Sequence, residues 1–273
     1  MSEILAVVER PLSVWERLWG YTPLRRVVIL ILLALLWQTY GVLANNPLMF
    51  PSFSATATAF SDAIIRGTLL KKAWTSVQVL LLGYGIGVTI AFILAGIAAS
   101  TRIGEDILAT LTAMFNPLPA IALLPLALLW FGLGTPSLLF VLVHAVVWPL
   151  ALNASAGFAA VSETLRMAGR NYGLTGWRYI ARILVPAAFP AILTGLKVGW
   201  AFAWRTLIAA ELVFGVASGS GGLGWFIFEN KNRLETDYVF AGLGTVILIG
   251  LAVEGLIFRT IERHTIRKWG MQR

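Results

Sequence analysis

Long apolar runs separated by short polar segments dominate this chain and predict a bundle of membrane-spanning helices. A helix needs about 20 predominantly apolar residues to cross the hydrocarbon core, because all its backbone groups must be hydrogen-bonded internally. Between Ile107 and Ser162 the only titratable residue is His144, and that stretch is long enough for two helices. Six spans are the most economical interpretation, and they are residues 27–43, 73–101, 107–131, 137–160, 190–214 and 238–258.

Glycine and proline modify three of these regions. The sequence from Gly132 to Pro136 predicts the turn between the third and fourth spans. Small residues allow helices to approach closely, and the second span contains Gly83, Gly85, Gly87 and Gly96.

The third span carries residues that disturb a helix. Proline removes a backbone donor and kinks helices, and this span contains Asn116, Pro117, Pro119 and Pro125. Broken helices at membrane depth line cavities. We therefore predict that this span forms the pore wall, and the candidate gate residues are Met114, Phe115 and Leu118.

Two segments between the spans differ in character. After Phe50-Pro51-Ser52, apolar residues recur at helical spacing, which predicts an amphipathic helix on the membrane surface; they are Phe53, Ala57, Phe60 and Ile64. The segment from Gly215 to Asp237 contains a glycine run at 219–224 and is expected to be a flexible loop. A nucleotide-binding glycine loop would also need a Lys-Ser or Lys-Thr pair, which this segment lacks.

Composition supports the membrane assignment. The chain is 58% hydrophobic and 12% charged, whereas soluble domains are about half apolar and about a quarter charged. It has no cysteine, which excludes disulfides and thiolate metal sites. His144 and His264 are far apart in sequence, so no metal, cofactor or catalytic centre is predicted. The net charge of +8 is attributed to cytoplasmic loops rather than to nucleic-acid binding.

The distribution of basic residues predicts the orientation. With the N-terminus inside, the inside segments hold fourteen Lys and Arg residues and the outside segments hold five. Residues 1–26 and the tail 259–273 are therefore expected in the cytoplasm, on either side of one transmembrane domain, 27–258. We interpret the first span as a retained helix, because its apolar run exceeds that of a cleaved signal peptide.

The predicted cytoplasmic segment 163–186 forms two short helices around a bend at Gly173. Leu165, Ala168 and Tyr172 share one face of the first helix. In the second, which Thr175 is expected to cap, Trp177, Ile180, Ala181 and Leu184 face one way. Arg166, Arg170, Arg178 and Arg182 are assigned to the polar side, and Pro186 ends the unit. Amphipathicity alone is also typical of a hairpin that rests on lipid headgroups.

The spacing in this hairpin resembles the EAA loop of permease subunits of binding-protein-dependent ATP-binding-cassette (ABC) importers. That pattern is E-A-A, three residues, G, nine residues, I, one residue, L-P. Gly173 is followed by nine residues and then by Ile183-Leu-Val-Pro186, while Met167-Ala168-Gly169 replaces E-A-A. The motif glutamate is therefore absent, and Val185 replaces the final leucine.

Further motifs are similar to the nitrate/sulfonate/taurine class of these permeases. They are Phe50-Pro-Ser52, Pro117-Leu-Pro119, Leu124-Pro125, Trp130-Phe-Gly132, the segments 186–196 and 204–212, and Gly222-Leu-Gly224. The resemblance implies an all-α, polytopic, type I ABC importer-like permease fold in a bacterial inner membrane. The implied cargo is a small anion such as a sulfonate, taurine or nitrate.

The resemblance also implies partners. These are two ABC ATPase subunits, a second permease copy forming a homodimer, and a periplasmic or lipid-anchored solute-binding protein. This chain lacks the phosphate-binding G-x-x-x-x-G-K-[ST] loop, so ATP and magnesium are expected on the ATPase. The residues implied at the ATPase contact are Ala168, Gly169, Gly173, Leu174, Trp177, Ile183 and Pro186.

Charges inside the last two spans are candidates for the pathway, because buried membrane charges normally face a cavity or a partner. Arg205 is assigned either to the substrate pathway or to an interhelical contact, and Glu211 to an anchor or the outer gate. Lys197 is near enough to the cytoplasmic end to snorkel, and Glu254 is expected to pair with a basic residue. His144 is interpreted as a hydrogen-bonded structural histidine rather than a proton relay.

Three other classes of membrane protein compare less well with this sequence or remain open. A secondary transporter or channel would often show inverted repeats, and none is convincing here. An intramembrane metalloprotease would need H-E-x-x-H, whereas His144 is followed by Ala-Val-Val-Trp. A membrane scaffold protein remains open on composition and would be distinguished by loop variants that lose transport but keep assembly.

Overall fold

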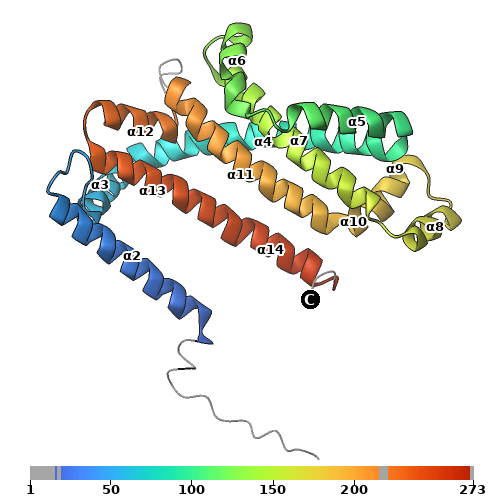
Figure 1. Ribbon diagram of the computed structural model, residues 1–273, viewed down its shortest axis with the longest axis horizontal. Helices are drawn as coiled ribbons and strands as arrows, with labels where there is room; N and C mark the ends of the chain where they lie inside the picture. The colour runs from blue at the N-terminus through green and yellow to red at the C-terminus, as the bar shows by residue number, and fades with distance from the viewer. Residues whose placement is uncertain (1–15, 17–19, 215–220, 271–273) are drawn as a thin grey trace, which may run out of the picture.

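The structure is a computed structural model that describes residues 16, 20–214 and 221–270 (Figure 1). Every regular element within these ranges is a helix, so the predicted all-α class is confirmed. The longest helices are α2 (Thr22–Ala44), α4 (Thr68–Ser100), α7 (Thr135–Ala159), α11 (Phe189–Phe214) and α13 (Thr236–Ala252).

Six helical segments account for the predicted spans. Four are long and apolar enough to cross a membrane unaided: α2, α4, α7 and the continuous segment Thr236–Arg267. This last segment comprises α13, η3 (Val253–Phe258), α14 (Arg259–Glu262) and η4 (Arg263–Arg267), and it extends beyond the expected end at residue 258. Two bent pairs bring the number to six.

Both bent pairs have a break at a position rich in proline. The first joins α5 (Arg102–Phe115) to η1 (Ala120–Leu123) and α6 (Leu124–Phe131) with a bend of 84°. The second joins the segment Gly176–Ala187 to α11 with a bend of 80°. The chain between the third and fourth spans turns at Gly132 and Gly134, which have φ of 71° and 149°.

Helices α4, α7 and α11 form the centre of the bundle, with α7 in contact with both of the others. Glycines on α4 permit this approach: an added Cβ would lie 2.8 Å from Leu142 Cβ at Gly83 and 2.7 Å from Val146 Cβ at Gly87. By contrast, Gly85 has nothing within 4 Å of an added Cβ, and neither has Gly96. Only two of the four predicted packing glycines are therefore contact residues, because the other two lie on different faces of the helix.

The Gly87→Leu substitution is expected to destabilise the bundle, whereas Gly85→Leu on the same helix is its matched control. A leucine at residue 87 must displace Val146, and overpacking of this kind costs about 1–3 kcal/mol. Thermal unfolding of the purified protein in detergent measures the difference. Equal melting temperatures for the two variants would contradict the assignment of the α4–α7 contact face.

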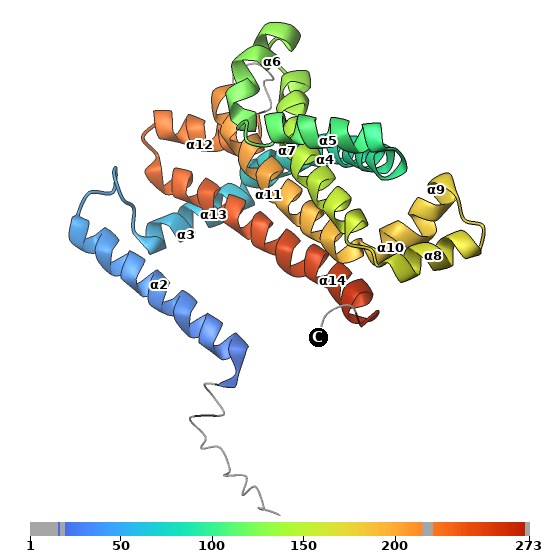
Figure 2. The same ribbon diagram turned by 45° about the vertical axis from the view of Figure 1, so that its right-hand side comes forward.

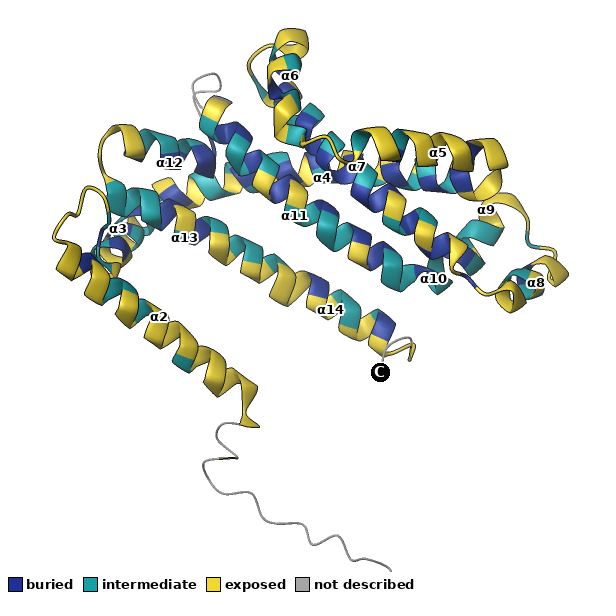
Figure 3. Cartoon of the chain, viewed as in Figure 1, coloured by how far each residue is buried: buried dark blue, intermediate teal, exposed yellow. Residues whose placement is uncertain are grey.

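The two ends of the bundle carry different elements. Helices α3 (Phe53–Ile65) and α12 (Leu223–Asn232) lie at one end, and α8 (Glu163–Asn171) and α9 (Gly176–Tyr179) lie at the other, on the same side as the C-terminal end (Figures 1 and 2). Helix α2 is exposed along most of its length (Figure 3). It contacts the start of α3 through Trp37, whose Nε1 donates to the Pro51 carbonyl at 2.9 Å, and through Gln38, which accepts from the Ser54 amide at 2.9 Å.

The predicted surface helix is present as α3, and its expected apolar face is confirmed in part: Phe60 and Ile64 pack against the core, whereas Ala57 is exposed. Ser52 caps the helix by accepting a hydrogen bond from the Ala55 amide at 3.2 Å. The buried residues are Thr56, Ala59 and Ala63, while Phe53 is exposed. Small residues face the bundle because α3 packs directly against α4 and α13.

A polar contact joins α3 to the start of α13. The Tyr238 hydroxyl donates a hydrogen bond to Asp62, which also forms an ion pair with Arg66. The hydrogen bond from Tyr238 is the main cause that lowers the pKa of Asp62 below its ordinary value. This contact fixes α3 against the last span.

The segment 215–237 was expected to be a flexible loop, and the structure describes only its residues 221–237. Residues 215–220 lie outside the described part of the chain. Residues 223–232 form helix α12, and Leu223, Phe226, Ile227 and Asn230 are buried. The expectation of a loop is therefore wrong for this part, because the glycine run hid the apolar face that follows it.

Candidate translocation cavity and coupling hairpin

A cavity of about 250 Å³ lies at the break in the third span. Its walls come from the α5–η1 connection, from α7 and from α11, which are three separate spans. Phe115 and Leu118, both predicted gate residues, line it, and so does Arg205. Met114, the third predicted gate residue, is exposed and does not line this cavity.

His144 fixes the broken segment to α7. The Trp148 Nε1–H group donates to His144 Nδ1 at 3.1 Å, and indole nitrogen can only donate. Nδ1 is therefore the acceptor and Nε2 carries the hydrogen, which it donates to the Leu118 carbonyl at 3.2 Å. Because both ring nitrogens form hydrogen bonds, His144 has a structural role and holds the broken segment against α7 at the cavity wall.

Arg205 is the charged residue of the cavity lining. Its guanidinium carbon lies 5.7 Å from the centroid of the Phe202 ring, a distance that is typical of a cation–π contact. Among the residues that the structure describes, Arg205 has no ion pair. The Arg205 side chain is exposed on the single chain, so a place in the substrate pathway and a contact with another helix both stay predictions.

Glu211 lies in a different environment from Arg205. It is buried, and Ser76 Oγ lies 2.8 Å from each of its carboxylate oxygens. The Gly224 amide donates to Glu211 Oε2 at 2.8 Å, and the Leu223 amide donates to Ser76 Oγ at 2.8 Å. This Glu211 network (Ser76, Glu211, Gly222, Leu223 and Gly224) joins α4, α11 and the start of α12.

The Gly222-Leu-Gly224 motif is explained by this network. An added Cβ at Gly222 would lie 2.1 Å from Ser76 Oγ, and one at Gly224 would lie 2.6 Å from Glu211 Cβ. No side chain fits at either position. Glu211 is thus placed as an anchor between α4, α11 and α12 and not on the cavity wall.

Replacing Glu211 by Ala is expected to destabilise the protein by about 2 kcal/mol or more, because the buried Ser76 hydroxyl and Gly224 amide lose their acceptor. Glu229→Ala is the control, since Glu229 forms a surface pair with Arg233 and such pairs contribute little. Thermal unfolding in detergent measures both variants. If Glu211→Ala has the same melting temperature as the wild type, the assignment of Glu211 as an anchor is wrong.

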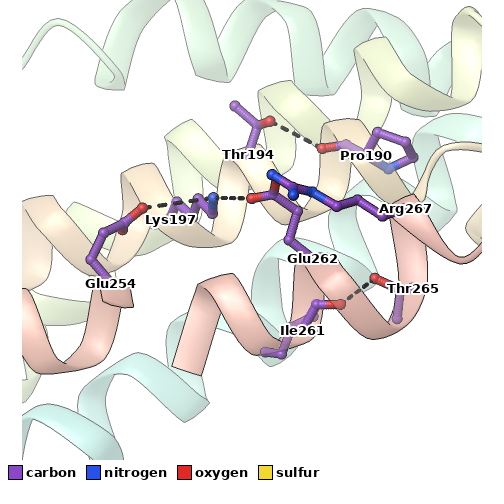
Figure 4. A network of polar contacts seen from close by, with 8 residues as sticks. All are labelled: Pro190, Thr194, Lys197, Glu254, Ile261, Glu262, Thr265 and Arg267. Carbon is purple, nitrogen blue, oxygen red and sulfur yellow. Dashed lines mark hydrogen bonds and ion pairs between the residues drawn. The ribbon is translucent and has the colours of Figure 1, made fainter. Parts of the chain in front are cut away.

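The N-terminal half of α11 is joined to the last span by an ion-pair network (Figure 4). Lys197 Nζ lies 3.0 Å from Glu262 Oε2 and 3.7 Å from Glu254 Oε1. Arg267 approaches the other oxygen of Glu262 at 3.5 Å. The basic partner expected for Glu254 is thus Lys197, and the network gives Lys197 a structural contact.

The predicted hairpin consists of α8, α9, η2 (Ile180–Leu184) and α10 (Val185–Ala187). Helix α8 ends at Asn171, and Gly173 has a φ of 70°, a left-handed conformation that glycine adopts without strain. The Leu174 amide then donates to the Gly169 carbonyl at 3.0 Å, a 6→1 hydrogen bond of the kind that ends many helices. The bend therefore occurs where the sequence predicted it.

Contacts between the two arms close the hairpin. An added Cβ at Gly169 would lie 3.0 Å from both Ile183 and Tyr179, so Gly169 allows close packing. Ala168, Leu174 and Pro186 are partly buried. Thr175 occupies the position before α9 but makes no side-chain capping bond, and Leu184 is buried in the core, unlike Trp177. The expected cap is therefore wrong. Of the expected face only Trp177 departs, since Ile180 packs against the same core cluster as Leu184.

The outward side of the hairpin is aromatic. Tyr172 is 85% exposed and Trp177 is 75% exposed. Leu165 and Met167 are also exposed on α8. Exposed aromatic residues on an otherwise polar segment are typical of the centre of a protein interface.

Arg166 turns away from the predicted polar side of the hairpin and back toward the bundle. Its Nε donates to the Val161 carbonyl at 3.1 Å, and its Nη2 donates to the Phe158 carbonyl at 2.6 Å. These carbonyls belong to the C-terminal end of α7 and the residues after it. The sequence assignment of Arg166 to the polar side was wrong, because carbonyls at a helix C-terminus are unpaired acceptors.

Within the described residues, no cluster of three or more His, Asp or Glu side chains has metal-binding geometry. The features above define a polytopic helical membrane protein with a cavity at a broken span and an aromatic hairpin at one end. Residues 87–265 match the family model of the binding-protein-dependent transport system inner membrane component. The chain belongs to this family.

Similar proteins with assigned names are also permease subunits. The chain is 29% identical over 227 residues to a putative ABC transporter permease protein of Methanocaldococcus jannaschii, covering 82% of this chain and 84% of the relative. It is 33% identical over 181 residues to the taurine transport system permease protein of Escherichia coli, with coverage of 66% and 62%. A putative aliphatic sulfonates transport permease protein of the same organism is 30% identical over 202 residues, with coverage of 74% and 75%.

The chain is therefore a multi-pass inner-membrane permease subunit of an ABC importer, and the predicted type I importer-like fold is confirmed. The cavity and the hairpin lie within the matched residues.

Proposed function

We propose that this permease carries a small anion through the inner membrane by alternating access, driven by ATP hydrolysis on a separate ATPase. The observation that carries the proposal is the course of α7. Its middle lines the cavity with His144 and Trp148, and its C-terminal end is bonded to the hairpin through Arg166. One helix therefore joins the expected ATPase contact to the cavity wall.

The mechanism follows from that connection. Closure of two ATPase subunits around ATP moves the hairpin, and Arg166 passes the movement to α7. Since α7 packs along α4 and α11, the spans move largely as a rigid body, which opens the cavity alternately to the two sides. ATP and magnesium bind to the ATPase, because this chain has no phosphate-binding loop.

The topology is proposed on the same basis. The hairpin and the C-terminal end lie at one end of the bundle (Figures 1 and 2), and this end carries most of the basic residues. That distribution favours a cytoplasmic position for both termini. Helices α3 and α12 at the opposite end would receive the solute from a periplasmic or lipid-anchored binding protein.

An anionic cargo is supported by Arg205 and by the relatives. The names of similar permeases refer to taurine, aliphatic sulfonates and nitrate. We propose the same class of solute for this chain, and a second copy of the permease as its partner in a homodimer.

Uptake into proteoliposomes tests this function. The tagged permease is purified with its partner chains, including the binding protein, and reconstituted with ATP on the ATPase side. Radiolabelled taurine, butanesulfonate and nitrate are then offered separately. Accumulation of one of these anions only with ATP is expected. Movement without ATP, driven by an ion gradient, would contradict the proposal and support the alternative, a secondary transporter or channel.

A further inference from the structure

The cavity has one charge and a flat aromatic wall. We infer that it binds a small monoanion with an apolar body, so that the permease selects its solute independently of the binding protein. In this assignment Arg205 holds the anionic group, while Phe115 and Trp148 contact the body. The inference rests on the proposed function, because it assigns the solute class to the same pathway.

Arg205 is the charged side chain of the cavity lining. The other polar side chains of the lining are neutral: Asn116, Thr206 and His144, whose two nitrogens are both engaged. A monoanion would neutralise Arg205. A dianion such as sulfate would retain one uncompensated charge against the apolar part of the lining. A neutral solute would displace water from Arg205 without supplying an anionic partner. In both cases an unpaired charge loses its hydration, which is unfavourable.

The aromatic lining of the cavity determines which ligand body it can accept. The rings of Phe115 and Trp148 are stacked, with centroids 5.1 Å apart and planes inclined by 20°. The hydrogen bond from Trp148 to His144 holds this pair in place. Pro117 and Pro149 also line the cavity, so the body of the ligand meets mostly rigid apolar surface. A volume of about 250 Å³ is smaller than that of pockets for drug-sized ligands, about 300 Å³ and above.

Equilibrium binding of radiolabelled benzenesulfonate to the permease–ATPase complex in lipid nanodiscs, without the binding protein, tests this inference. Saturable binding is expected, with competition by unlabelled benzenesulfonate. The neutral isostere benzenesulfonamide and the dianion sulfate are expected to compete at least about tenfold less well, because a hydrogen bond to a charged group contributes about 1.5–3 kcal/mol.

Variants separate the two contacts. Arg205→Gln should weaken benzenesulfonate binding at least about tenfold, whereas Arg259→Gln, an exposed arginine outside the cavity, should not change it. Phe115→Ala should weaken binding of benzenesulfonate but leave competition by methanesulfonate unchanged, since that anion is too short to need the wall.

The outcomes are distinguishable from failure of the proposed function. If the ATPase co-purifies but benzenesulfonate does not bind, or binds equally to Arg205→Gln, the inference is wrong and the importer assignment stands. Equal competition by sulfate would also overturn it. If no ATPase co-purifies, the proposed function itself fails.

Discussion

Replacing Trp177 by Ala is expected to weaken binding of the ATPase by at least about 2 kcal/mol, which is about 30-fold in affinity. Trp177 is 75% exposed at the free side of the hairpin, so its removal creates no cavity in the permease. A large exposed aromatic residue that becomes buried on docking is the usual centre of an interface. Titration of the purified permease with its ATPase, followed by fluorescence anisotropy, measures the affinity.

Trp74→Ala is the matched control for this variant. Trp74 is 60% exposed on α4, near the opposite end of the bundle from the hairpin. The Trp74→Ala variant should bind the ATPase with wild-type affinity. If both variants, or neither, lose affinity, the hairpin is not the specific docking surface.

Replacing Arg166 by Gln is expected to uncouple ATP hydrolysis from transport. The two hydrogen bonds from its guanidinium to carbonyls at the end of α7 contribute about 1.5–3 kcal/mol each when the donor is charged. Without them the hairpin can still bind the ATPase, but its movement is no longer delivered to α7. We expect solute uptake to fall at least about tenfold, while ATP hydrolysis changes less than about twofold.

The ratio of solute transported to ATP hydrolysed is the decisive measurement for Arg166. Arg170→Gln on the same helix is the control, because Arg170 is exposed, and it should keep the wild-type ratio. Arg166→Lys should give an intermediate ratio, since an ammonium group lacks the fork that reaches two acceptors. Hydrolysis and uptake that fall in equal proportion would show a general structural role instead.

The features predicted from sequence are those that depend on local pattern. Pro117 and Pro119 remove backbone donors, so the break in the third span was predictable. Gly173 adopts a φ that favours glycine, and the bend of the hairpin followed from it. The spans were predictable because lipid requires uninterrupted apolar helices.

The features missed depend on residues that are distant in sequence. Glu211 is bonded to Ser76, which lies 135 positions away, and no local pattern shows this pair. Helix α12 was hidden by the glycine run at its start, because Gly222 and Gly224 serve a close contact with Ser76 and Glu211. Gly85 and Gly96 are indistinguishable from Gly83 and Gly87 until the neighbouring helix is placed.

The most direct test of the central claim is a pull-down of the tagged chain from detergent-solubilised native membranes, with identification of co-purifying chains and an ATPase assay. The account predicts that a P-loop ATPase co-purifies with the wild type and hydrolyses ATP, and that it is lost from Gly173→Glu, which strains the bend and adds charge at the contact. A wild-type chain that purifies alone and moves solute into liposomes without ATP would contradict it.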